Sequence, residues 1–379
     1  MRAQPVQHNR RLWFDLGGSA LGESAAQTAS DTAATLRVRT VGRFDAATAL
    51  GGGEVQLAAT TAALRELGHD ARPWRPWEDQ LAAGDVVHYF GSRPEFLPLI
   101  DQAHRQGAKC AVSTIAWFDW RNAWREPGSL AGRCLAAGRY AARAAFPRTP
   151  SWRRGLYHAA DLLLPNSQSE AEQLMRLFEI SPQKIHVVPN GADPRFGAAR
   201  PELFHRRFGV HDFVLSVGRL EPRKNQLALV RAVRDLKRPL VQIGSAVAGH
   251  EDYAEHCRRE AGPAALFLDR LEHDDPLLAS AYAACACAAL VGWYETPGLA
   301  AIEAAMTGAP LVLPEGGCGR EYFGPRAEYV AAGDVVGIRR AVERAASRGR
   351  DPAWGRLICE QFSWRRGAEV TADAYATLR

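Results

Sequence analysis

The chain has 379 residues, a length that suits two domains of ordinary size or one unusually large domain. Of these residues 47% are hydrophobic and 23% are charged, the balance of a soluble globular protein. Its net charge of +5 is too small for a nucleic-acid-binding surface, which needs a concentrated basic stripe. No uncharged apolar stretch approaches the roughly 18 residues of a membrane span. No charged-then-apolar signal peptide is recognisable at the N-terminus.

Seven cysteines are present, an odd number, and no two have the CxxC spacing of a metal or redox site. Most of them lie within apolar runs, where cysteine behaves as a small buried hydrophobic residue. Unpaired cysteines of this kind are typical of a reducing compartment. We therefore expect a cytoplasmic protein, with peripheral attachment to the inner face of the membrane as an open alternative.

Residues 1–34 are rich in Ala, Ser, Gly and Gln, and they fit either a flexible leader or an early strand followed by a helix. From Thr35 onward, short apolar runs alternate with longer amphipathic stretches, and a helix is predicted over 54–67. This alternation predicts parallel βαβ units in a doubly wound sheet. The strands predicted for this half span 36–41, 71–74, 85–90, 109–115, 161–164 and 184–188.

The pattern breaks at Val188–Gly191, and we place a domain boundary there because proline and glycine cluster around it. The alternation restarts with strands predicted at 213–217, 240–243, 265–268, 286–291 and 311–313. We therefore expect an α/β protein with two doubly wound, Rossmann-like domains over 35–190 and 191–361, and a helix over 362–379. Ligands of such sheets bind beyond the carboxyl ends of the strands, so the site is expected where the two sheets face each other across a cleft.

The stretch from Trp293 to Met306 follows a predicted strand. Thr296 suits an N-cap and Pro297 the first helical position, so a helix is predicted to begin at Pro297. The free amides at Gly298, Leu299 and Ala300 would then point into the cleft and bind phosphate or sugar hydroxyls.

Two acidic residues accompany this predicted helix. Glu295 precedes it and is placed to accept hydrogen bonds from hydroxyl groups, and Glu303 lies about two turns in, leaning towards the helix start. The alternative is that Glu295 assists capping and Glu303 is a solvated helix residue.

The second informative stretch runs from Ser216 to Gln226 and contains Gly218, Arg219 and Lys224. The planar fork of Arg219 and the point charge of Lys224 would together neutralise a diphosphate leaving group. No DxD pair of carboxylates is present to hold a divalent metal, so we expect a site without a metal ion. A basic, solvated helix start is the alternative.

Three features of the first domain are candidates for binding. The amides of Gly51, Gly52 and Gly53 precede a helix and would approach a phosphate or an acceptor, although a flexible turn fits equally well. They are not a dinucleotide fingerprint, because a GxGxxG pattern needs glycine where Gln56 stands. His88 ends a strand on the side of the cleft, where a satisfied structural role is favoured over an acceptor-side role.

Six arginines lie among Ala, Leu and aromatic residues over 133–154. This stretch predicts either a basic face that rests on an anionic membrane, where lipid-linked acceptors reside, or a solvated helix surface. The residues are Arg133, Arg139, Arg143, Arg148, Arg153 and Arg154.

Residues 217–226 and 294–306 resemble the two signature blocks of the family-4, retaining glycosyltransferases of the GT-B fold, including the Glu-x7-Glu element at Glu295 and Glu303. Supporting similarity lies at 163–167, 187–192 and 308–312. The resemblance covers most of 160–335 and more weakly about 36–115.

The resemblance implies a role for each matching residue. Arg219 and Lys224 match the pair that binds the donor diphosphate and acts in catalysis, and Glu295 and the amides of Gly298 and Leu299 match the sugar-contacting loop. Glu303 matches the acid that binds the nucleotide ribose. The donor, a nucleoside-diphosphate (NDP) sugar, would need no metal or other cofactor and would lie mainly on the second domain.

Further implications follow from the same resemblance. The acceptor, a glycan or a lipid-linked glycan, would lie on the first domain, and the terminal helix would cross back to that domain. Residues 318–324 resemble a variant found in members that build surface polysaccharides.

One departure concerns a histidine that many members carry after the fourth strand. The corresponding residues 113–119 contain none. Either Asp119 takes its place on the acceptor side, or the departing phosphate acts as the base and fixed positive charge does most of the work. The alternatives left open are a non-catalytic sugar-nucleotide-binding or scaffold protein and another nucleotide-sugar enzyme, such as an epimerase or phosphorylase.

Overall fold

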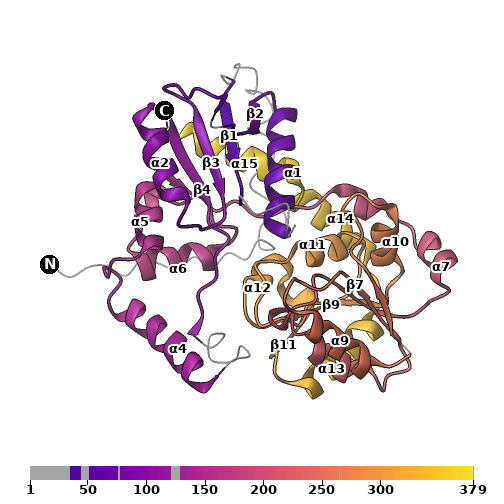
Figure 1. Ribbon diagram of the computed structural model, residues 1–379. Coiled ribbons are helices and arrows are strands. Elements are labelled where there is room, and N and C mark those ends of the chain that lie inside the picture. The colour runs from indigo at the N-terminus through magenta and orange to yellow at the C-terminus, as the bar shows by residue number, and fades with distance from the viewer. Residues whose placement is uncertain (1–34, 44–50, 76, 121–128, 264, 379) are drawn as a thin grey trace.

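The computed structural model describes residues 35–43, 51–75, 77–120, 129–263 and 265–378 (Figure 1). Two α/β domains, each built on a parallel sheet, follow one another along the chain, as the sequence predicts. The N-terminal segment 1–34, for which a leader or an early strand and helix are expected, lies outside the described residues.

The first domain holds a five-stranded parallel sheet with the order β2-β1-β3-β4-β5. Its strands are β1 (Arg37–Val41), β2 (Asp70–Pro73), β3 (Val86–Phe90), β4 (Lys109–Ser113) and β5 (Leu162–Leu163). The described helices of this domain are α1 (Gly52–Glu66), α2 (Phe96–Arg105), α4 (Leu130–Ala145), α5 (Trp152–Ala159) and α6 (Gln168–Phe178). Because side chains alternate between faces along a strand, Val87 packs against α2, α5 and α6, whereas Val86 packs towards α1.

The second domain holds a six-stranded parallel sheet with the order β11-β10-β9-β6-β7-β8. Its strands are β6 (Val214–Val217), β7 (Leu240–Ile243), β8 (Leu266–Leu268), β9 (Cys287–Ala289), β10 (Leu311–Pro314) and β11 (Ala327–Val330). The helices that follow α6 are α7 (Glu202–Phe208), α8 (Gln226–Val233), α9 (Glu251–Ala261), α10 (Pro276–Ala284), α11 (Leu299–Met306), α12 (Gly319–Phe323), α13 (Val335–Arg348), α14 (Pro352–Gln361) and α15 (Trp364–Ala376). One face packs against α10, α11 and α14 and the other against α8, α9 and α13. None of the described helices combines the length and apolar character of a membrane span.

Two strand predictions differ from the structure. Residues 184–188 do not form a strand, because β5 is only two residues long and offers a single bridge, from Leu163 to Ile185. The preceding Pro182–Lys184 forms a 3-10 turn instead. Conversely, β11 was not predicted. Only its first and last residues, Ala327 and Val330, are buried, and Glu328 and Tyr329 between them leave no continuous apolar run.

The chain passes between the domains twice, at neighbouring points. Val188 packs in the core of the first domain, whereas Ala192 packs in the core of the second. The return crossing follows α14, where the amide of Ala192 donates to the carbonyl of Phe362 at 2.8 Å and Ala192 bridges Ser363. The two crossings therefore form one double-stranded connection.

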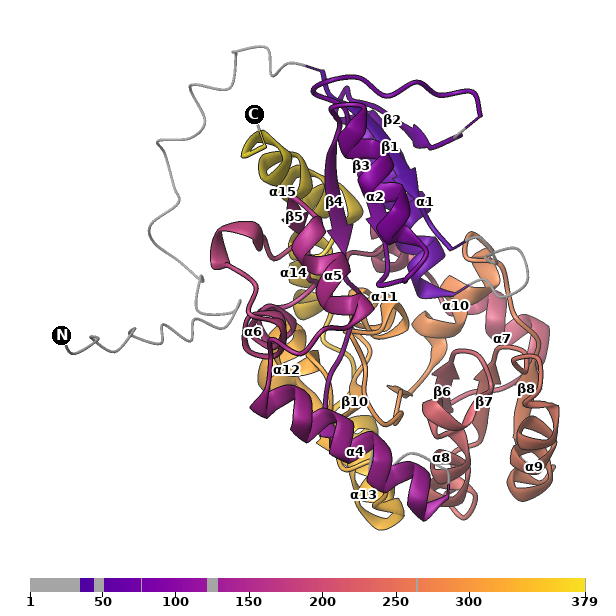
Figure 2. The ribbon, with the colours of Figure 1, turned by 60° about the vertical axis from the view of Figure 1, so that its left-hand side comes forward.

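The last helix, α15, lies against the first domain, behind its sheet (Figures 1 and 2). The hydroxyl of Tyr375 lies 2.7 Å from Nδ1 of His88, and Nε2 of His88 lies 2.9 Å from Oγ of Ser113. His88 also stacks on Phe90 and is 1% exposed. Both ring nitrogens are bonded within the core, which agrees with the structural role favoured for His88 and leaves neither nitrogen free for an acceptor. Burial accordingly lowers the pKa of His88 to about 3.

Candidate functional site

The candidate site lies where the N-terminus of α1 meets the carboxyl end of the second sheet. A Cβ built on Gly51 would lie 3.6 Å from Nη1 of Arg219, which follows β6. A Cβ built on Gly52 would lie 3.7 Å from Cδ1 of Leu299, the first residue of α11. The glycine turn of one domain thus contacts both predicted donor-binding segments of the other.

In the segment after β6, Arg219 precedes a 3-10 turn, Pro222–Lys224, which ends with Lys224, and α8 begins only afterwards. At the start of this segment, the amide of Gly218 donates to the carbonyl of Ile243 at 3.0 Å. Glu221 accepts from Arg223 at 3.0 Å and lies 3.5 Å from Arg219. The side chain of Arg219 is 36% exposed, so this guanidinium remains accessible to a ligand while its orientation is restricted.

Lys224 and Glu295 form an ion pair at the centre of the site. Nζ of Lys224 donates to Oε1 of Glu295 at 2.5 Å, and their side chains are only 20% and 6% exposed. Burial lowers the pKa of Lys224, and the charge of Glu295 opposes that fall. Removing one member of a buried pair costs about 3–5 kcal/mol because the other charge stays uncompensated, so this pair fixes both side chains.

The backbone of Glu295 is anchored by the loop that follows β10. Its amide donates to the carbonyl of Gly316 at 3.2 Å, and its carbonyl accepts from the amide of Cys318 at 3.1 Å. A Cβ on Gly317 would lie 1.9 Å from the carbonyl oxygen of Glu295. Only glycine permits this approach, so Gly317 is needed to hold Glu295 in place.

Helix α11 begins at Leu299, two residues later than predicted. Its N-cap is Gly298, with a φ of +81°, and neither Thr296 nor Pro297 is part of the helix. The prediction was wrong because the bridge between Glu295 and the loop at Gly317 holds the chain out of a helical path. The amides of Leu299 and Ala300 are within the first turn, where helical amides lack a partner in their own helix.

Glu303 lies on the buried side of α11 and is 4% exposed, which contradicts the alternative of a solvated helix residue. The hydroxyl of Tyr282 on α10 donates to its Oε2 at 2.7 Å, and Nδ1 of His273 lies 3.4 Å from its Oε1. Burial raises the pKa of Glu303 to about 7, although the hydrogen bond from Tyr282 opposes this rise. Neither neighbour is predictable from the sequence, since neither belongs to a recognisable motif. The ribose role of Glu303 stays a prediction.

The two domains also meet at α12 and α6, which lie side by side in both views (Figures 1 and 2). The carboxylate of Glu321 accepts from the amides of Gln168 and Ser169 at 2.7 and 2.9 Å, at the N-terminus of α6. The hydroxyl of Tyr322 donates to the carbonyl of Asn166 at 2.6 Å and accepts from the amide of Asn190 at 2.9 Å. This junction joins the loop that anchors Glu295 to the first domain.

Asp119, the suggested substitute for the histidine, is half-buried in the segment that follows β4. Two residues earlier, Trp117 packs against the core of the second domain. The acceptor-side role of Asp119 stays a prediction.

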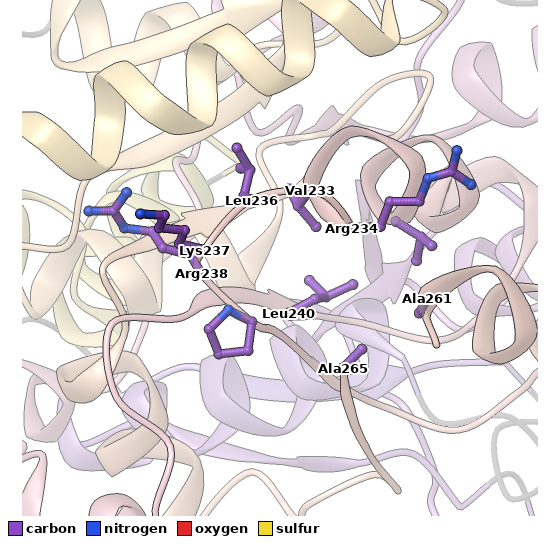
Figure 3. Close-up of a pocket in the computed structure, with 10 residues that line it drawn as sticks. Val233, Arg234, Leu236, Lys237, Arg238, Leu240, Ala261 and Ala265 are labelled. Carbon is purple, nitrogen blue, oxygen red and sulfur yellow. The ribbon is translucent and has the colours of Figure 1, made fainter. Parts of the chain in front are cut away.

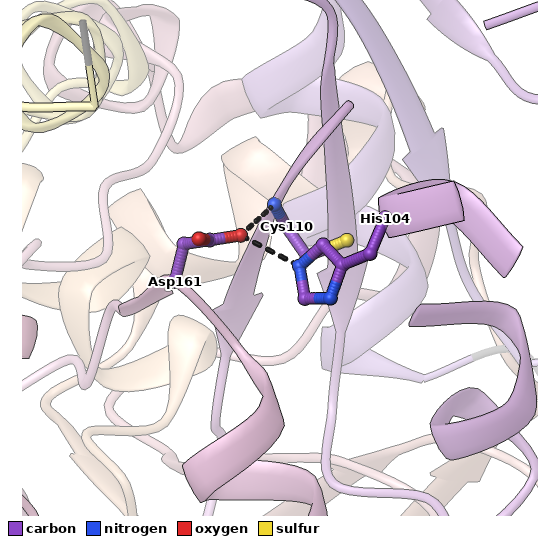
Figure 4. A group of neighbouring side chains, drawn as sticks. All are labelled: His104, Cys110 and Asp161. Atoms are coloured by element: carbon purple, nitrogen blue, oxygen red, sulfur yellow. Dashed lines mark hydrogen bonds and ion pairs between the residues drawn. The ribbon is translucent and has the colours of Figure 1, made fainter. Parts of the chain in front are cut away.

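A cluster of three polar side chains lies at the other end of the first sheet, where its strands begin. His104, Cys110 and Asp161 gather at the amino end of β4, with ligand atoms within 4.8 Å of one another (Figure 4). Asp161 accepts from the amide of Cys110 and pairs with His104 Nε2, both at 2.8 Å, and Lys109 Nζ lies 3.4 Å away. Burial raises the pKa of the Cys110 thiol to about 12. These contacts favour a structural ion pair rather than a metal centre.

A small cavity of about 120 Å³ lies in the second domain between the end of α8 and the start of β7 (Figure 3). Its lining includes Arg234, Lys237 and Arg238. This cavity is at the amino end of β7, whereas doubly wound sheets bind ligands beyond the carboxyl ends of their strands. We therefore assign it no part in the site.

The raised pKa of Glu303 has a consequence for stability. A carboxyl whose pKa rises from 4.5 to about 7 on folding stabilises the protein fully below pH 4.5, and this contribution is lost as the pH rises through 7. We expect the free energy of unfolding of the wild type to fall by about 3 kcal/mol relative to Glu303→Gln between pH 4 and 8. Chemical denaturation at each pH measures this difference, and the exposed Glu343→Gln variant is the control. Parallel curves for wild type and Glu303→Gln would contradict the assignment.

Two family descriptions match the chain over consecutive segments. Residues 50–196 match Glycosyltransferase Family 4, and residues 211–348 match Glycosyl transferases group 1. The two segments coincide with most of the two domains and include all of the described site residues.

Individual relatives agree with this match. A D-inositol 3-phosphate glycosyltransferase from Nocardioides sp. is 29% identical over 253 residues, which is 58% of this chain and 54% of the relative. The chain thus spans about half the length of this relative. A glycogen synthase from Mycobacterium tuberculosis is 29% identical over 335 residues, covering 83% of this chain and 72% of the relative.

Solved structures share the fold. Sucrose-phosphate synthase from Thermosynechococcus elongatus superposes with a TM-score of 0.68 at 18% identity, covering 90% of this chain and 99% of that one. HepE from Anabaena, solved with UDP-glucose, gives a TM-score of 0.64 at 16% identity over 91% and 99% of the two chains. With its two parallel-sheet domains and both family matches, the chain belongs to the group 1, family 4 glycosyltransferases of the GT-B fold.

Proposed function

We propose that the chain transfers a sugar from an NDP-sugar to a glycan or lipid-linked acceptor, with retention of configuration and without a metal ion. One observation carries this proposal: Arg219 and the start of α11 lie against the glycine turn of α1, and Lys224 is held in the same site by its ion pair with Glu295. Two cations and the start of two helices supply the positive potential that a departing diphosphate requires.

The proposed reaction breaks the bond between the anomeric carbon and the diphosphate oxygen. The acceptor hydroxyl forms its new bond to that carbon on the same face, and its proton passes to the departing phosphate. Arg219 and Lys224 stabilise the negative charge as it grows on the diphosphate. Glu295, which is fixed by Lys224 and by the loop at Gly317, accepts hydrogen bonds from sugar hydroxyls and so orients the ring.

The ion pair of Lys224 and Glu295 prepares the site for its donor. A lysine confined at 2.5 Å from a carboxylate loses little rotational freedom when a phosphate binds, so less binding energy goes into ordering it. The phosphate then shares the ammonium group with Glu295, because an ammonium has three donors.

The nature of the donor and acceptor is proposed from the relatives. HepE is solved with UDP-glucose, so UDP-sugars are the first donors to examine. Glycogen synthase acts on a glycan, and a Campylobacter jejuni relative that is 39% identical over 99 residues is named for a diphospho-undecaprenol acceptor. We propose a cytoplasmic reaction in the synthesis of a surface polysaccharide.

A non-catalytic sugar-nucleotide-binding protein of the same fold is the second candidate. It is favoured by one observation, the absence of histidine from residues 113–119. It predicts donor binding without turnover.

The donor site is tested by thermal shift with UDP-, GDP-, ADP- and dTDP-sugars in the presence of EDTA. We expect one nucleotide class to raise the melting temperature, and we expect this stabilisation to grow with the ratio of ligand concentration to Kd. Arg219→Ala and Lys224→Ala are expected to reduce that ligand-induced shift by more than half, because each removes a charge that faces the diphosphate. The exposed Lys237→Ala (Figure 3) is the matched control. Equal shifts in all three variants would overturn the assigned phosphate site.

Catalysis is tested with the donor that stabilises the protein and with glycan or polyprenyl-diphosphate acceptors. We expect transfer that persists in EDTA and a product whose anomeric configuration, read by proton NMR, equals that of the donor. Because it loses transition-state charge stabilisation, Arg219→Ala should lower kcat by about 100-fold. Inverted product would contradict retention, loss of activity in EDTA would contradict metal independence, and binding without any turnover would favour the second candidate.

We also propose that α4 brings the first domain into peripheral contact with an anionic membrane. No residue of α4 is buried, and Leu130, Leu135 and Phe146 are more than half exposed. Figure 1 shows α4 standing away from the body of its domain. Residues 129–154 contain six arginines and no acidic residue, so this surface is both basic and apolar, which suits an anionic lipid interface.

A cavity of about 410 Å³ beneath α4 supports this contact. Its lining combines aromatic rings with arginines and is composed in part of Phe118, Tyr140, Trp152, Phe178, Arg139 and Arg153. Arg153 lies over the rings of Trp152 and Phe118. A lipid chain with an anionic head matches such a lining.

Membrane contact is tested by co-sedimentation with phosphatidylglycerol-containing and purely zwitterionic vesicles. We expect binding to the anionic vesicles alone, and its loss at 0.5 M salt. At about 1 kcal/mol for each basic residue near the surface, Arg139→Glu with Arg148→Glu should weaken binding by more than tenfold. Arg340→Glu with Arg365→Glu is the control with the same charge change. Equal binding to both vesicle types, or no binding at low salt, would discard the proposal.

A further inference from the structure

The segment after β4 contains a backbone conformation that its sequence disfavours. Ile115 has a φ of +43°, in the left-handed region that β-branched residues rarely occupy. Such a conformation costs on the order of 1–3 kcal/mol and persists only where the surroundings impose it. The groups that impose it are therefore informative.

A single buried carboxylate bridges the two residues that flank Ile115. Oε1 of Glu170, on α6, accepts from Thr114 Oγ1 at 2.5 Å and from the amide of Ala116 at 2.6 Å. Its Oε2 accepts from the amide of Asn166 at 2.9 Å, and the residue is fully buried. Burial raises the pKa of Glu170 to about 7, although its three hydrogen bonds oppose this rise. Hydrogen bonds to the ionised carboxylate are roughly twice as strong as neutral ones, so Glu170 is able to offset the strain.

Other side chains hold the rest of the segment. Ser92 Oγ donates to the carbonyl of Thr114 at 2.7 Å. Gln173, one turn along α6 from Glu170, accepts from the amide of Phe118 at 2.7 Å, and the hydroxyl of Tyr140 donates to the carbonyl of Phe118. The backbone from Thr114 to Phe118 is thus fixed by side chains of other elements.

The clamped segment borders the proposed donor site. A Cβ built on Gly53 would lie 3.7 Å from Cδ1 of Ile115, and Gly53 belongs to the turn whose first two glycines contact Arg219 and Leu299. On the other side, Trp117 packs against the core of the second domain. The path of residues 114–117 therefore determines how the first domain faces the donor.

We propose that Glu170 is a positioning residue for sugar transfer, which holds the strained turn at Ile115 and thereby fixes residues 116–117 against the donor side of the interdomain junction. This inference rests on the proposed function. Glu170 touches neither donor nor acceptor in this assignment, and it acts through the backbone that it holds. The donor is predicted to lie mainly on the second domain, so the effect of Glu170 falls chiefly on turnover, with little change in donor affinity.

The test compares wild type with Glu170→Gln. In this variant an NH2 group would replace the oxygen that accepts from the amide of Asn166, so two hydrogen-bond donors would face each other. Glu172→Gln, an exposed change of the same kind two residues along α6, is the control. We expect Glu170→Gln to lower kcat at least tenfold, to leave donor Kd within about twofold, and to speed amide hydrogen exchange in peptides that cover 114–118. The control should change none of these.

A rescue separates positioning from general damage to the fold. Asparagine tolerates the left-handed conformation far better than isoleucine, so the turn in Ile115→Asn needs the carboxylate less. We expect Glu170→Gln to lower kcat by less than about threefold when it is added to Ile115→Asn, compared with Ile115→Asn alone. An equal loss in both backgrounds, or unchanged exchange over 114–118, would overturn the inference.

The outcome also distinguishes this inference from the proposed function. An active wild type whose kcat is unchanged by Glu170→Gln would overturn the inference alone. A wild type that binds donor but transfers nothing to any acceptor would overturn the proposed function, and the positioning role with it.

Discussion

The ion pair between Lys224 and Glu295 is the contact on which the rest of the site depends. Each side chain is largely removed from water, and each would be costly to bury alone. Their mutual attraction therefore orders two segments that are far apart in sequence, the turn after β6 and the loop before α11. The same pair leaves ammonium hydrogens available for a phosphate, so the interaction that organises the site without a ligand is also suited to receive one.

The influence of this pair extends into the first domain. Glu295 is bonded through its backbone to the loop at 316–318, and α12 follows that loop directly. The carboxylate of Glu321 on α12 then accepts hydrogen bonds from two amides at the N-terminus of α6, the helix that carries Glu170. Hydrogen bonds and short stretches of chain thus join the donor loop of one domain to the strained turn of the other, so a displacement at either end would disturb these bonds.

Much of the fold was predictable because the apolar runs of parallel strands are distinct in this sequence. Arg219, Lys224 and Glu295 were also identifiable, since each belongs to a block with a recognisable pattern. The start of α11 was not, because the bridge from Glu295 to Gly317 overrides the helix-start signal of Thr296 and Pro297. Glu170, Tyr282 and His273 were missed for a related reason: each acts through a partner that is distant in sequence, and no local pattern marks such a residue.

The double crossing between the domains has a mechanical consequence. Because the segments at Ala192 and Ser363 are hydrogen-bonded to each other, a displacement of one strand of the connection would carry the other with it. The final helix covers the core of the first domain, through Tyr375, and continues directly from the second strand of this connection. Truncation before Ser363 would therefore expose apolar surface on the first domain and also remove the bridge from Ala192 to the second strand of the connection.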